Sequence, residues 1–296
     1  MQLGAHVSAA GGLDKTVERA ETIGCDCIQV FTRNQRTWQP KPITEEEAAA
    51  FHAARAGREL GAVMSHGSYL VNPSSPDAEK HAKSYAAMEA ELDRCHRFGI
   101  GLYNFHPGAH MEKGTDWALR RTAETLNRLC AEHPEQGDVR LVLENVAGQG
   151  TTIGRTFEEL AGIFEHLEQP QRFGVCVDTA HAFAAGYELS DEDGWERTWR
   201  DFDRALGLER LVAIHLNDSK APFDSRKDRH ALVGRGEIGP RMFEWILTDP
   251  RTRDVPMFLE TPGGPEGWKA ELRWLRAVAA GERPPLPEIE EAGPAL

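Results

Sequence analysis

The sequence predicts an α/β fold, and within that class a (β/α)8 TIM barrel. Eight short β-rich runs alternate with helical patterns and recur roughly every 36 residues, the length of one strand, one helix and two loops. An open doubly wound sheet is the alternative, but such a sheet usually carries a G-x-G-x-x-G loop after its first strand. The stretch AAGGLDK (9–15) lacks that pattern, so the barrel is favoured.

The strands are expected where apolar and β-branched residues gather in short runs between turn signals. The eight runs are LGAHV (3–7), CIQVFT (27–32), AVMS (62–65), LYNF (102–105), RLVL (140–143), VCV (175–177), LVAI (211–214) and VPMFL (255–259). Two intervening helices have clear ends. Thr44 is a helix N-cap with Glu47 completing a capping box, and the helical pattern that begins DAEKHAK ends on Gly99.

The composition is that of a globular protein. Of the 296 residues, 40% are hydrophobic and 27% are charged, and we find no apolar run long enough for a membrane span and no signal peptide. The five cysteines are odd in number and form no C-x-x-C pair, so we expect reduced thiols in a cytoplasmic protein. We expect residues 1–280 to form a single barrel domain, and the Pro-rich, acidic tail at 281–296 to be peripheral or disordered.

Six successive strand runs are each followed by a side chain that can bind a metal. These residues are His66, His106, Glu144, Asp178, His215 and Glu260. The C-terminal ends of barrel strands converge on one face, where active sites lie, so we expect the six side chains to meet there. Zinc and manganese accept imidazole and carboxylate ligands readily. A single His here is usually structural and a single Asp or Glu is often an N-cap, but six such coincidences at one place are improbable.

Three further ligand candidates lie between the strands. His181 follows Asp178 by three residues, and SRKDRH places Asp228 and His230 two apart, so that both side chains point the same way in an extended loop. Nine ligands suit three ions. A pair of ions about 3.5–4 Å apart activates water and braces both sides of a phosphoryl displacement. Glu144 and Asp178 are natural candidates to hold or bridge that pair, and Asp178 and His181 would then serve different ions.

Longer motifs cover almost the whole chain except the tail. They are GAHVSAAGGL (4–13), FTRNQR (31–36), HGSYLVN (66–72), NFHPGAH (104–110), LENVAGQG (143–150), VDTAHAFAAGY (177–187), HLNDSK (215–220) and DRH (228–230). In this order the motifs resemble those of the endonuclease IV family, which are apurinic/apyrimidinic endonucleases on a xylose isomerase-like barrel. The resemblance implies that fold and that activity for this chain.

The resemblance also implies three zinc ions, with manganese able to replace zinc at one site. The first ion would be held by His66, His106 and Glu144; the second by Glu144, Asp178, His215 and Glu260; and the third by His181, Asp228 and His230. Among these ligands, Glu144 and Glu260 are the catalytic candidates.

The implied reaction is hydrolysis of the phosphodiester 5′ to an abasic site in duplex DNA, leaving a 3′-hydroxyl and a 5′-deoxyribose phosphate. The family also clears blocked 3′ ends, and we expect a monomer. The family's DNA-inserting residues fall on Arg36, Tyr69 and Leu70. Two positions depart from the family pattern. Gly67 stands where an Asp is common, which would affect the loop that carries Tyr69, and Ala180 stands where a Cys is frequent.

The net charge of −13 would by itself argue against a nucleic-acid partner. Three zinc ions would add six positive charges at one face. Basic residues in the loops of the same face are candidates to pair with phosphates: Arg33, Arg36, Arg226, Lys227, Arg229 and Arg235.

Two alternative functions remain open from the sequence. A metal-dependent sugar isomerase or epimerase on the same barrel would also use strand-end carboxylates and histidines, usually with fewer metals. The set of His181, Asp228 and His230 argues against it. A damaged-DNA binder without chemistry would have no need for nine ligands. His6 and His110 also lie near strand ends, and we expect them beside the ligands or in structural roles.

Overall fold

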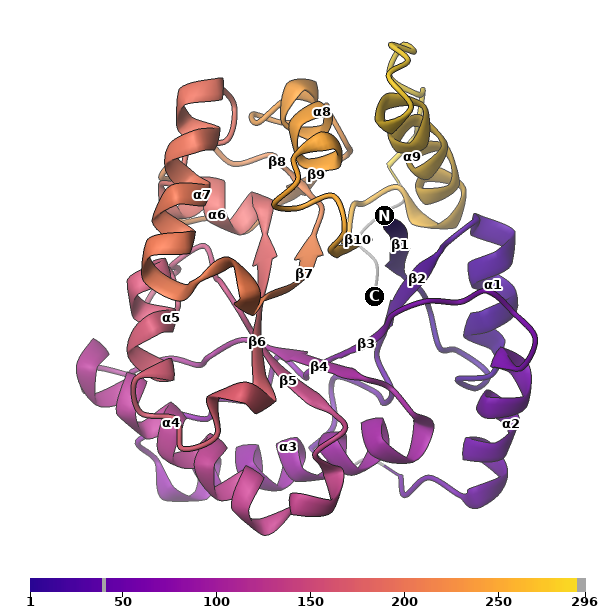
Figure 1. The fold of residues 1–296 in the computed structure, drawn as a ribbon. Helices are drawn as coiled ribbons and strands as arrows, with labels where there is room; N and C mark the ends of the chain where they lie inside the picture. Colours follow the sequence, from indigo (N-terminus) through magenta and orange to yellow (C-terminus); the bar gives the residue numbers. More distant parts are fainter. Residues whose placement is uncertain (39–40, 292–296) are drawn as a thin grey trace.

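Eight parallel strands close into a barrel in the computed structural model, which describes residues 1–38 and 41–291 (Figure 1). The barrel strands are β1 (Gln2–His6), β2 (Cys27–Val30), β3 (Val63–His66), β4 (Leu102–Phe105), β5 (Arg140–Glu144), β6 (Phe173–Asp178), β7 (Leu211–His215) and β10 (Pro256–Leu259). Their order is β1-β10-β7-β6-β5-β4-β3-β2, so the last barrel strand closes the ring on the first. Each strand lies within two residues of a predicted run, and the predicted (β/α)8 fold is confirmed.

Helices follow the strands and surround the barrel (Figure 1). The α-helices are α1 (Lys15–Ile23), α2 (Glu45–Arg55), α3 (Ala78–Phe98), α4 (Thr115–Glu132), α5 (Phe157–Phe164), α6 (Thr179–Ala185), α7 (Glu192–Leu206), α8 (Pro240–Thr248) and α9 (Gly264–Ala279), and single 3₁₀ turns are η1 (Pro134–Gln136), η2 (Pro170–Arg172) and η3 (Leu208–Arg210). The predicted capping box of Thr44 and Glu47 is present at the start of α2. Helix α3 ends at Gly99, whose φ of 64° suits glycine. In the described ranges, no helix has the length and apolar character needed to cross a membrane.

The segment after β7 contains two short strands that the sequence pattern does not predict. These are β8 (Asp218–Ser219) and β9 (His230–Ala231), which pair in antiparallel fashion. The buried Asp218 carboxylate anchors the segment, because it accepts the backbone N–H groups of Gly236 and Ile238 at 2.9 and 3.1 Å. The extended loop expected around the DRH motif therefore runs directly into a strand.

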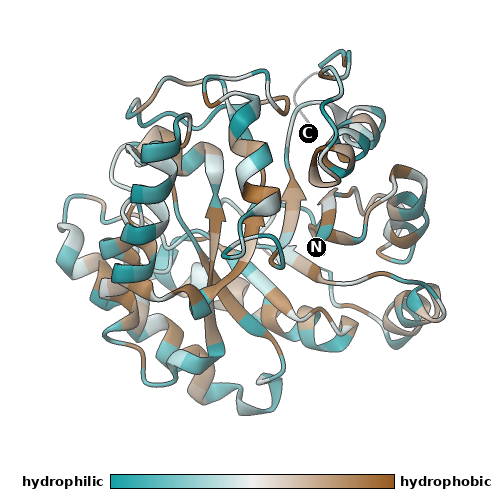
Figure 2. Ribbon diagram, turned by 45° about the horizontal axis from the view of Figure 1, so that its top comes forward, coloured by the Kyte–Doolittle hydropathy of each residue, from teal (hydrophilic) through white to brown (hydrophobic). Residues whose placement is uncertain are grey.

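Two layers of inward-facing side chains fill the barrel. The lower layer, called here the barrel floor, is apolar and separate from the larger core between strands and helices. It consists of Cys27, Met64, Val142, Cys176, Ala213 and Phe258. Figure 2 shows the hydrophobic residues concentrated along the central strands, with hydrophilic residues on the outer faces of the helices. Side chains alternate across a strand, so the next inward-facing residue lies two positions further along each strand.

The layer above the barrel floor, called here the polar layer, consists of polar side chains only. Its members are His6, Gln29, His66, Asn104, Glu144, Asp178, His215 and Glu260. In β1 the floor position is Gly4, where a Cβ would lie only 1.7 Å from the carbonyl oxygen of Cys27 in β2. The barrel interior thus changes from apolar to polar within one step along every strand. The polar layer lies at the C-terminal ends, the face predicted to carry the site.

The described part of the tail, residues 281–291, lies against the barrel. Arg235 donates a hydrogen bond to the carbonyl of Pro287 at 2.7 Å, and Lys220 pairs with Glu291 at 2.6 Å. Both basic residues belong to the segment between β7 and α8, so these contacts bring the tail to the C-terminal face of the barrel. The rest of the tail lies outside the described residues.

Candidate metal centre

Glu144 lies at the middle of the site, and only 1% of its surface is exposed. Its two carboxylate oxygens face different partners. Oε2 lies 3.2 Å from His66 Nε2 and 3.5 Å from His106 Nε2, and it accepts a hydrogen bond from the Asn104 amide at 2.6 Å. Oε1 lies 3.0 Å from His215 Nδ1. One carboxylate therefore joins two groups of imidazoles on opposite sides.

A second group forms around His215 at the end of β7. Its Nδ1 faces three carboxylates: besides Glu144, it lies 3.5 Å from Glu260 Oε2 and 3.8 Å from Asp178 Oδ2. Asp178 is also the N-cap of α6, because its Oδ1 accepts the N–H of His181 at 2.8 Å. The cap uses Oδ1 and leaves Oδ2 facing the imidazoles, so capping and metal binding, which the sequence presents as alternatives for this residue, are compatible.

The third group lies above the barrel strands, where Asp228 bridges two imidazoles. Its carboxylate lies 3.2 Å from His181 Nε2 and 3.3 Å from His230 Nε2. The His230 Nε2 atom also lies 3.4 Å from Asp178 Oδ2. Since Asp228 is in a loop, His230 in β9 and His181 in α6, this group depends on segments that follow the strands rather than on the strands themselves.

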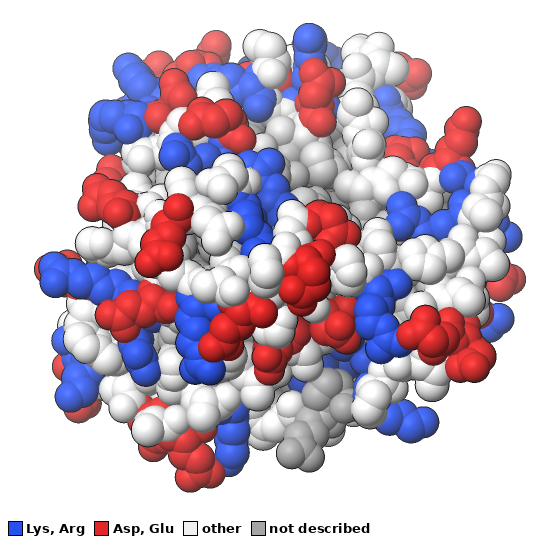
Figure 3. All heavy atoms as spheres, turned by 60° about the horizontal axis from the view of Figure 1, so that its bottom comes forward, with Lys and Arg blue, Asp and Glu red and all other residues white. Residues whose placement is uncertain are grey.

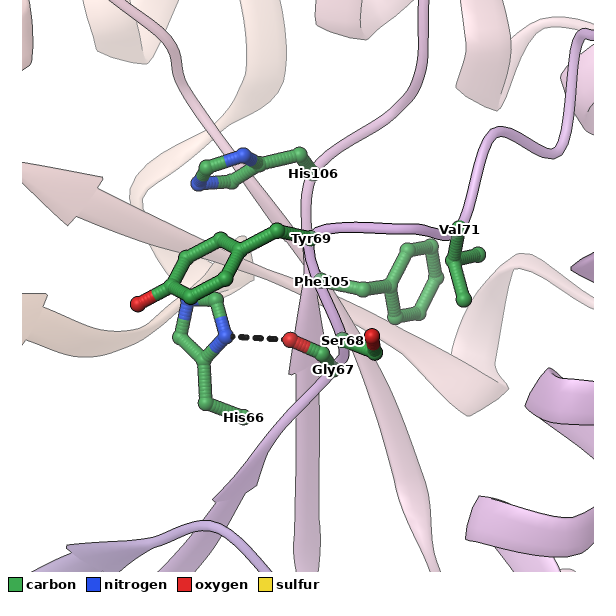
Figure 4. A pocket seen from close by; sticks show the side chains of 7 residues that line it. All are labelled: His66, Gly67, Ser68, Tyr69, Val71, Phe105 and His106. Carbon is green, nitrogen blue, oxygen red and sulfur yellow. Dashed lines mark hydrogen bonds between the residues drawn. The ribbon is translucent and has the colours of Figure 1, made fainter. Parts of the chain in front are cut away.

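Backbone carbonyls orient two of the imidazoles. His66 donates from Nδ1 to the carbonyl of Gly67 at 2.8 Å, the contact drawn in Figure 4. His181 donates from Nδ1 to the carbonyl of Asn145 at 3.0 Å. With Nδ1 donating to the backbone, the neutral form of each ring has its lone pair on Nε2, the atom that faces the carboxylates, which is the tautomer that a metal ligand needs.

The buried charges of the site shift one another's pKa values. Burial by itself would raise the pKa of the Glu144 carboxyl, but the charges of His215 and His106 outweigh burial and hold that pKa well below its usual range. For His215, burial would lower the pKa, whereas Cys176, Glu144 and Glu260 raise it, and the result lies well above the usual range. The pKa values of His66 and His181 are also raised. Ionised carboxylates thus face imidazoles that hold protons where a metal cation would otherwise lie.

The donor set fits metal cations. Within the described residues, the buried Nε2 atoms of His106 and His230 have no hydrogen-bond partner, although both face carboxylate oxygens. Three groups bring one possible ligand atom of each member within 4.8 Å of the others: His66, His106 and Glu144; Glu144, Asp178 and His215; and Asp178, His181 and His230. Imidazole and carboxylate donors in such groups suit zinc or manganese.

A fourth group of the same kind lies away from the barrel mouth, on α3, on α4 and at the residue that follows α4. It consists of Glu89, Glu132 and His133. Glu132 accepts hydrogen bonds from Arg128 and Tyr85, and the His133 ring lies between two carboxylates. These contacts account for its polar groups, so we regard it as a helix-surface network.

A small pocket of about 30 Å³ opens beside the first group and is lined by Tyr69, His66 and His106 (Figure 4). Tyr69 is 70% exposed, yet its ring centroid lies 5.8 Å from that of Phe31 and 6.0 Å from that of His66. Its neighbour Leu70 is 37% exposed. The sequence-predicted pair therefore stands on the rim of the site with its apolar surface open to solvent.

Gly67 is packed rather than free. A Cβ at this position would lie 3.0 Å from the Cβ of Phe105 and 3.3 Å from the carbonyl of Asn104. The Gly67 N–H donates to that same carbonyl at 2.7 Å. The glycine therefore lets the loop that begins at Gly67 lie directly on β4, and a side chain here would require Phe105 or the backbone of Asn104 to shift by a few tenths of an ångström.

Some of the basic residues expected to pair with phosphates are not free to contact DNA. The Arg33 side chain is buried and pairs with the buried Glu91 at 3.3 Å, so the expectation for Arg33 is wrong. Arg33 is drawn inside because a buried Glu91 carboxylate without a counter-charge would be costly. Arg235 contacts the tail, as described above. The four others are exposed: Arg36, Arg226, Lys227 and Arg229. On the face in Figure 3, basic and acidic side chains are interspersed.

The polar layer also contains side chains that the strand-end pattern does not single out. His6 lies beside Glu260, with 3.2 Å between Nδ1 and Oε1, whereas His110 lies in the loop after β4 and accepts the N–H of Gly114. Gln29 and Asn104 are completely buried in β2 and β4 and contact site residues. Reading every second residue along each strand, rather than the residue that follows it, would have identified both.

Comparison with known proteins shows the family to which the chain belongs. A profile of the xylose isomerase-like TIM barrel family matches residues 17–278. The molecule is therefore a barrel of that class with a polar, metal-ligand-rich C-terminal face. A probable endonuclease 4 from Halorhodospira halophila is 62% identical over 290 residues, which cover 98% of each chain. The chain belongs to the endonuclease 4 family, and the resemblance of its motifs is confirmed.

Solved structures support the same family assignment. The crystal structure of endonuclease IV from Thermus thermophilus matches with a TM-score of 0.85 at 33% identity, covering 95% of this chain and 100% of that chain. A D-tagatose 3-epimerase-like protein matches with a TM-score of 0.72 at only 16% identity, covering 95% of this chain and 99% of that chain. That likeness shows the fold alone. The barrel is thus shared by nucleases and sugar enzymes, and the side chains of the site must distinguish them.

Proposed function

We propose that this chain is a metal-dependent apurinic/apyrimidinic endonuclease. It hydrolyses the phosphodiester 5′ to an abasic site in duplex DNA and leaves a 3′-hydroxyl and a 5′-deoxyribose phosphate. The same hydrolysis removes blocking groups from 3′ ends. The observation that carries the proposal is the meeting of nine imidazole and carboxylate side chains in three groups, beneath an exposed aromatic–aliphatic pair.

The nine side chains fit three zinc ions, with manganese able to replace one. We assign His66, His106 and Glu144 to the first; Glu144, Asp178, His215 and Glu260 to the second; and His181, Asp228 and His230 to the third. When bound, such ions supply Lewis acidity to a phosphodiester and a nucleophile from water at neutral pH. Glu144 is placed to bridge because Oε2 faces the first group and Oε1 faces the second.

Catalysis requires the scissile phosphate to reach the bottom of the barrel mouth. An abasic nucleotide lacks base stacking, so turning it out of the duplex costs less than turning out an intact one, which is one source of selectivity. Tyr69 and Leu70 are exposed on the rim and can wedge into the gap left by the missing base, and the exposed Arg36 can fill the base stack. Glu144 and Glu260, the catalytic candidates, lie in the polar layer below.

The exposed basic residues hold the DNA backbone at this face. Arg226, Lys227 and Arg229 lie in the loop that also carries Asp228, so phosphate contacts there would position the duplex against the third group. The net charge of −13 keeps the rest of the surface unfavourable for DNA, which confines binding to the face where the metal charges lie. We further propose that residues 1–280 act as a single catalytic unit, and that the protein is a cytoplasmic monomer.

The test uses a duplex with one tetrahydrofuran abasic analogue, incubated with the zinc-loaded chain, and products mapped at nucleotide resolution. The analogue has no aldehyde, so β-elimination cannot cleave it. We expect a single cut on its 5′ side that leaves a 3′-hydroxyl extendable by a polymerase. An undamaged duplex should stay intact.

Protein carrying Glu144→Gln, purified in parallel, controls for a contaminating nuclease and should not cut. No cut by a wild-type preparation that contains its metals would overturn the proposal. Conversion of a ketose to its epimer by the same preparation would then support the sugar-enzyme alternative.

A further inference from the structure

We infer that Gln29 is a positioning residue that fixes the orientation of His215 and Glu260. The inference rests on the proposed assignment of these two residues as ligands of the second ion. Gln29 is in β2, and none of its surface is exposed. Neither His215 nor Glu260 lies on a strand adjacent to β2, since β1 and β10 stand between β2 and β7 around the barrel. The Gln29 side chain therefore reaches them across the barrel interior.

The amide of Gln29 makes short contacts at both ends. Its Oε1 lies 2.6 Å from His215 Nε2. Its Nε2 lies 2.6 Å from Glu260 Oε1 and 2.8 Å from His6 Nδ1. A buried amide without partners would be costly, and here both the carbonyl and the NH₂ group are satisfied by groups of the site itself.

The neighbouring carboxylate determines which way the amide points. The reverse orientation would place the Gln29 carbonyl oxygen 2.6 Å from Glu260 Oε1, where two acceptors without a hydrogen between them repel. The NH₂ group must therefore face Glu260. The carbonyl oxygen then faces His215, and it can only accept.

This orientation fixes the tautomer of the neutral His215 ring. The Nε2–H of His215 donates to the Gln29 carbonyl, so in the neutral ring that a metal ligand requires, the lone pair is on Nδ1, which faces Glu144, Asp178 and Glu260. Where His66 and His181 use backbone carbonyls for this purpose, His215 uses a side chain. The same amide holds Glu260 Oε1, which leaves Glu260 Oε2 as the oxygen that faces the second group at 3.5 Å from His215 Nδ1.

The experiment replaces Gln29 and measures zinc directly. In Gln29→Leu, loss of the amide should lower the affinity for one of the three zinc ions by about 10- to 100-fold. This is the usual effect of removing a group that orients metal ligands. Zinc content after dialysis and the rate of zinc release to a chromogenic chelator report this. The other two ions should be retained. Because Gln29 does not face the rim, kcat on the tetrahydrofuran duplex should fall while KM is unchanged.

A spectroscopic signature separates positioning from a general packing defect. In ¹⁵N-histidine-labelled, zinc-loaded protein, the Nε2–H signal of His215, assigned by its loss in His215→Asn, should be shifted downfield by its short hydrogen bond. That signal should move in Gln29→Leu and stay in Asn104→Leu, a matched change in the same layer that removes a contact to Glu144 instead. Gln29→Asn tests the case in which the Leu variant fails to fold. Its shorter amide should reproduce the selective zinc loss.

Unchanged binding of all three ions together with an unmoved His215 signal would overturn the inference. Equal loss of all three ions would also overturn it, since it would indicate a general defect. These readouts do not depend on DNA cleavage. Selective loss of one ion from a protein that does not cut abasic DNA would uphold Gln29 while overturning the proposed function.

Discussion

Two parts of the site are built in different ways, and the difference indicates which of the proposed ligands are held rigidly. The strand-borne proposed ligands, His66, Glu144, Asp178 and His215, are the last residues of their strands and are between 0% and 5% exposed. Asp228 in the loop before β9 and His230 at the start of β9 are called here the loop-borne pair. They are more open, with 39% of the Asp228 side chain and 17% of the His230 side chain exposed. Barrel closure fixes the first set, whereas the pairing of the two-residue strands β8 and β9 and the contact between His181 and Asp228 hold the second. Changes in the first set should therefore affect fold, metals and activity together.

Glu144→Gln should have the largest effect on cleavage and on zinc content, because Glu144 belongs to the strand-borne set. On the proposed assignment, the substitution removes a ligand from both the first and the second group, and it leaves the imidazoles without their counter-charge. We expect cleavage of the tetrahydrofuran duplex to fall by about 10³-fold or more, with loss of up to two zinc ions. Metal analysis and single-turnover kinetics check this. A variant with three ions and activity within tenfold of the wild type would contradict the bridging role.

Asp228→Asn should affect only the loop-borne group. We expect one zinc ion to be lost, the other two to remain, and kcat to fall by about 10²-fold, because a misplacement of about 1 Å in an active site can cost that much. The exposed Asp224 in the same loop provides the control, since Asp224→Asn removes an equal charge but no ligand. Equal zinc loss in both variants would show that loop charge rather than coordination is responsible.

Metal removal should make stability depend on pH in opposite directions for the two parts. His215 has a raised pKa in the folded protein, so its contribution is present below about 6.5 and is lost as pH rises through the raised value. Asp228 has a pKa lowered to about 2 by His181 and His230 despite burial, so its contribution is lost only as pH falls toward that value.

The Tm of the metal-free protein should therefore fall as pH rises above about 6.5, whereas the Tm of the zinc-loaded protein should not. Thermal unfolding over this range, with and without zinc, measures the difference. A metal-free Tm that rises over the same range would show that the site imidazoles are neutral in the folded protein.

Lys227→Gln should have the smallest effect. It removes one phosphate contact next to the loop-borne group, so the slope of log Kd against log salt should fall by about 1 while zinc content stays unchanged. Lys83→Gln on α3, which removes a cation already paired with Glu79, is the matched control and should leave the slope unchanged. Identical slopes for wild type and Lys227→Gln would show that Lys227 does not contact the DNA backbone.

The strand-borne part of the site was predictable, and the reason is geometric. Parallel strands of one barrel end on one face, so the six strand-end residues found in the sequence had to converge. The rule that reads only the residue after each apolar run missed Gln29, because the run CIQVFT contains it, and missed Asn104 for the same reason. Alternation along the strand identifies both.

The loop-borne part depended on contacts between distant segments. The DRH spacing indicated Asp228 and His230, but nothing local predicted that Asp218 would anchor a hairpin to place them. Arg33 shows the opposite failure. Its motif indicates an exposed loop cation, and only Glu91 on α3 reveals that the charge is needed inside the protein. Local sequence cannot show a partner that is supplied by tertiary packing.

The pairing of β1 with β10 determines at which stage of folding the site is complete. The two strands are nearly a whole chain apart, and the contact between His6 and Glu260 spans 254 residues. Contacts of such long range form late, because the chain must lose much of its freedom before they are made. The strand that closes the ring also carries Glu260 at its end. A partly folded chain therefore lacks both a finished barrel and a finished second group, so hydrolytic power should arise only with the complete fold.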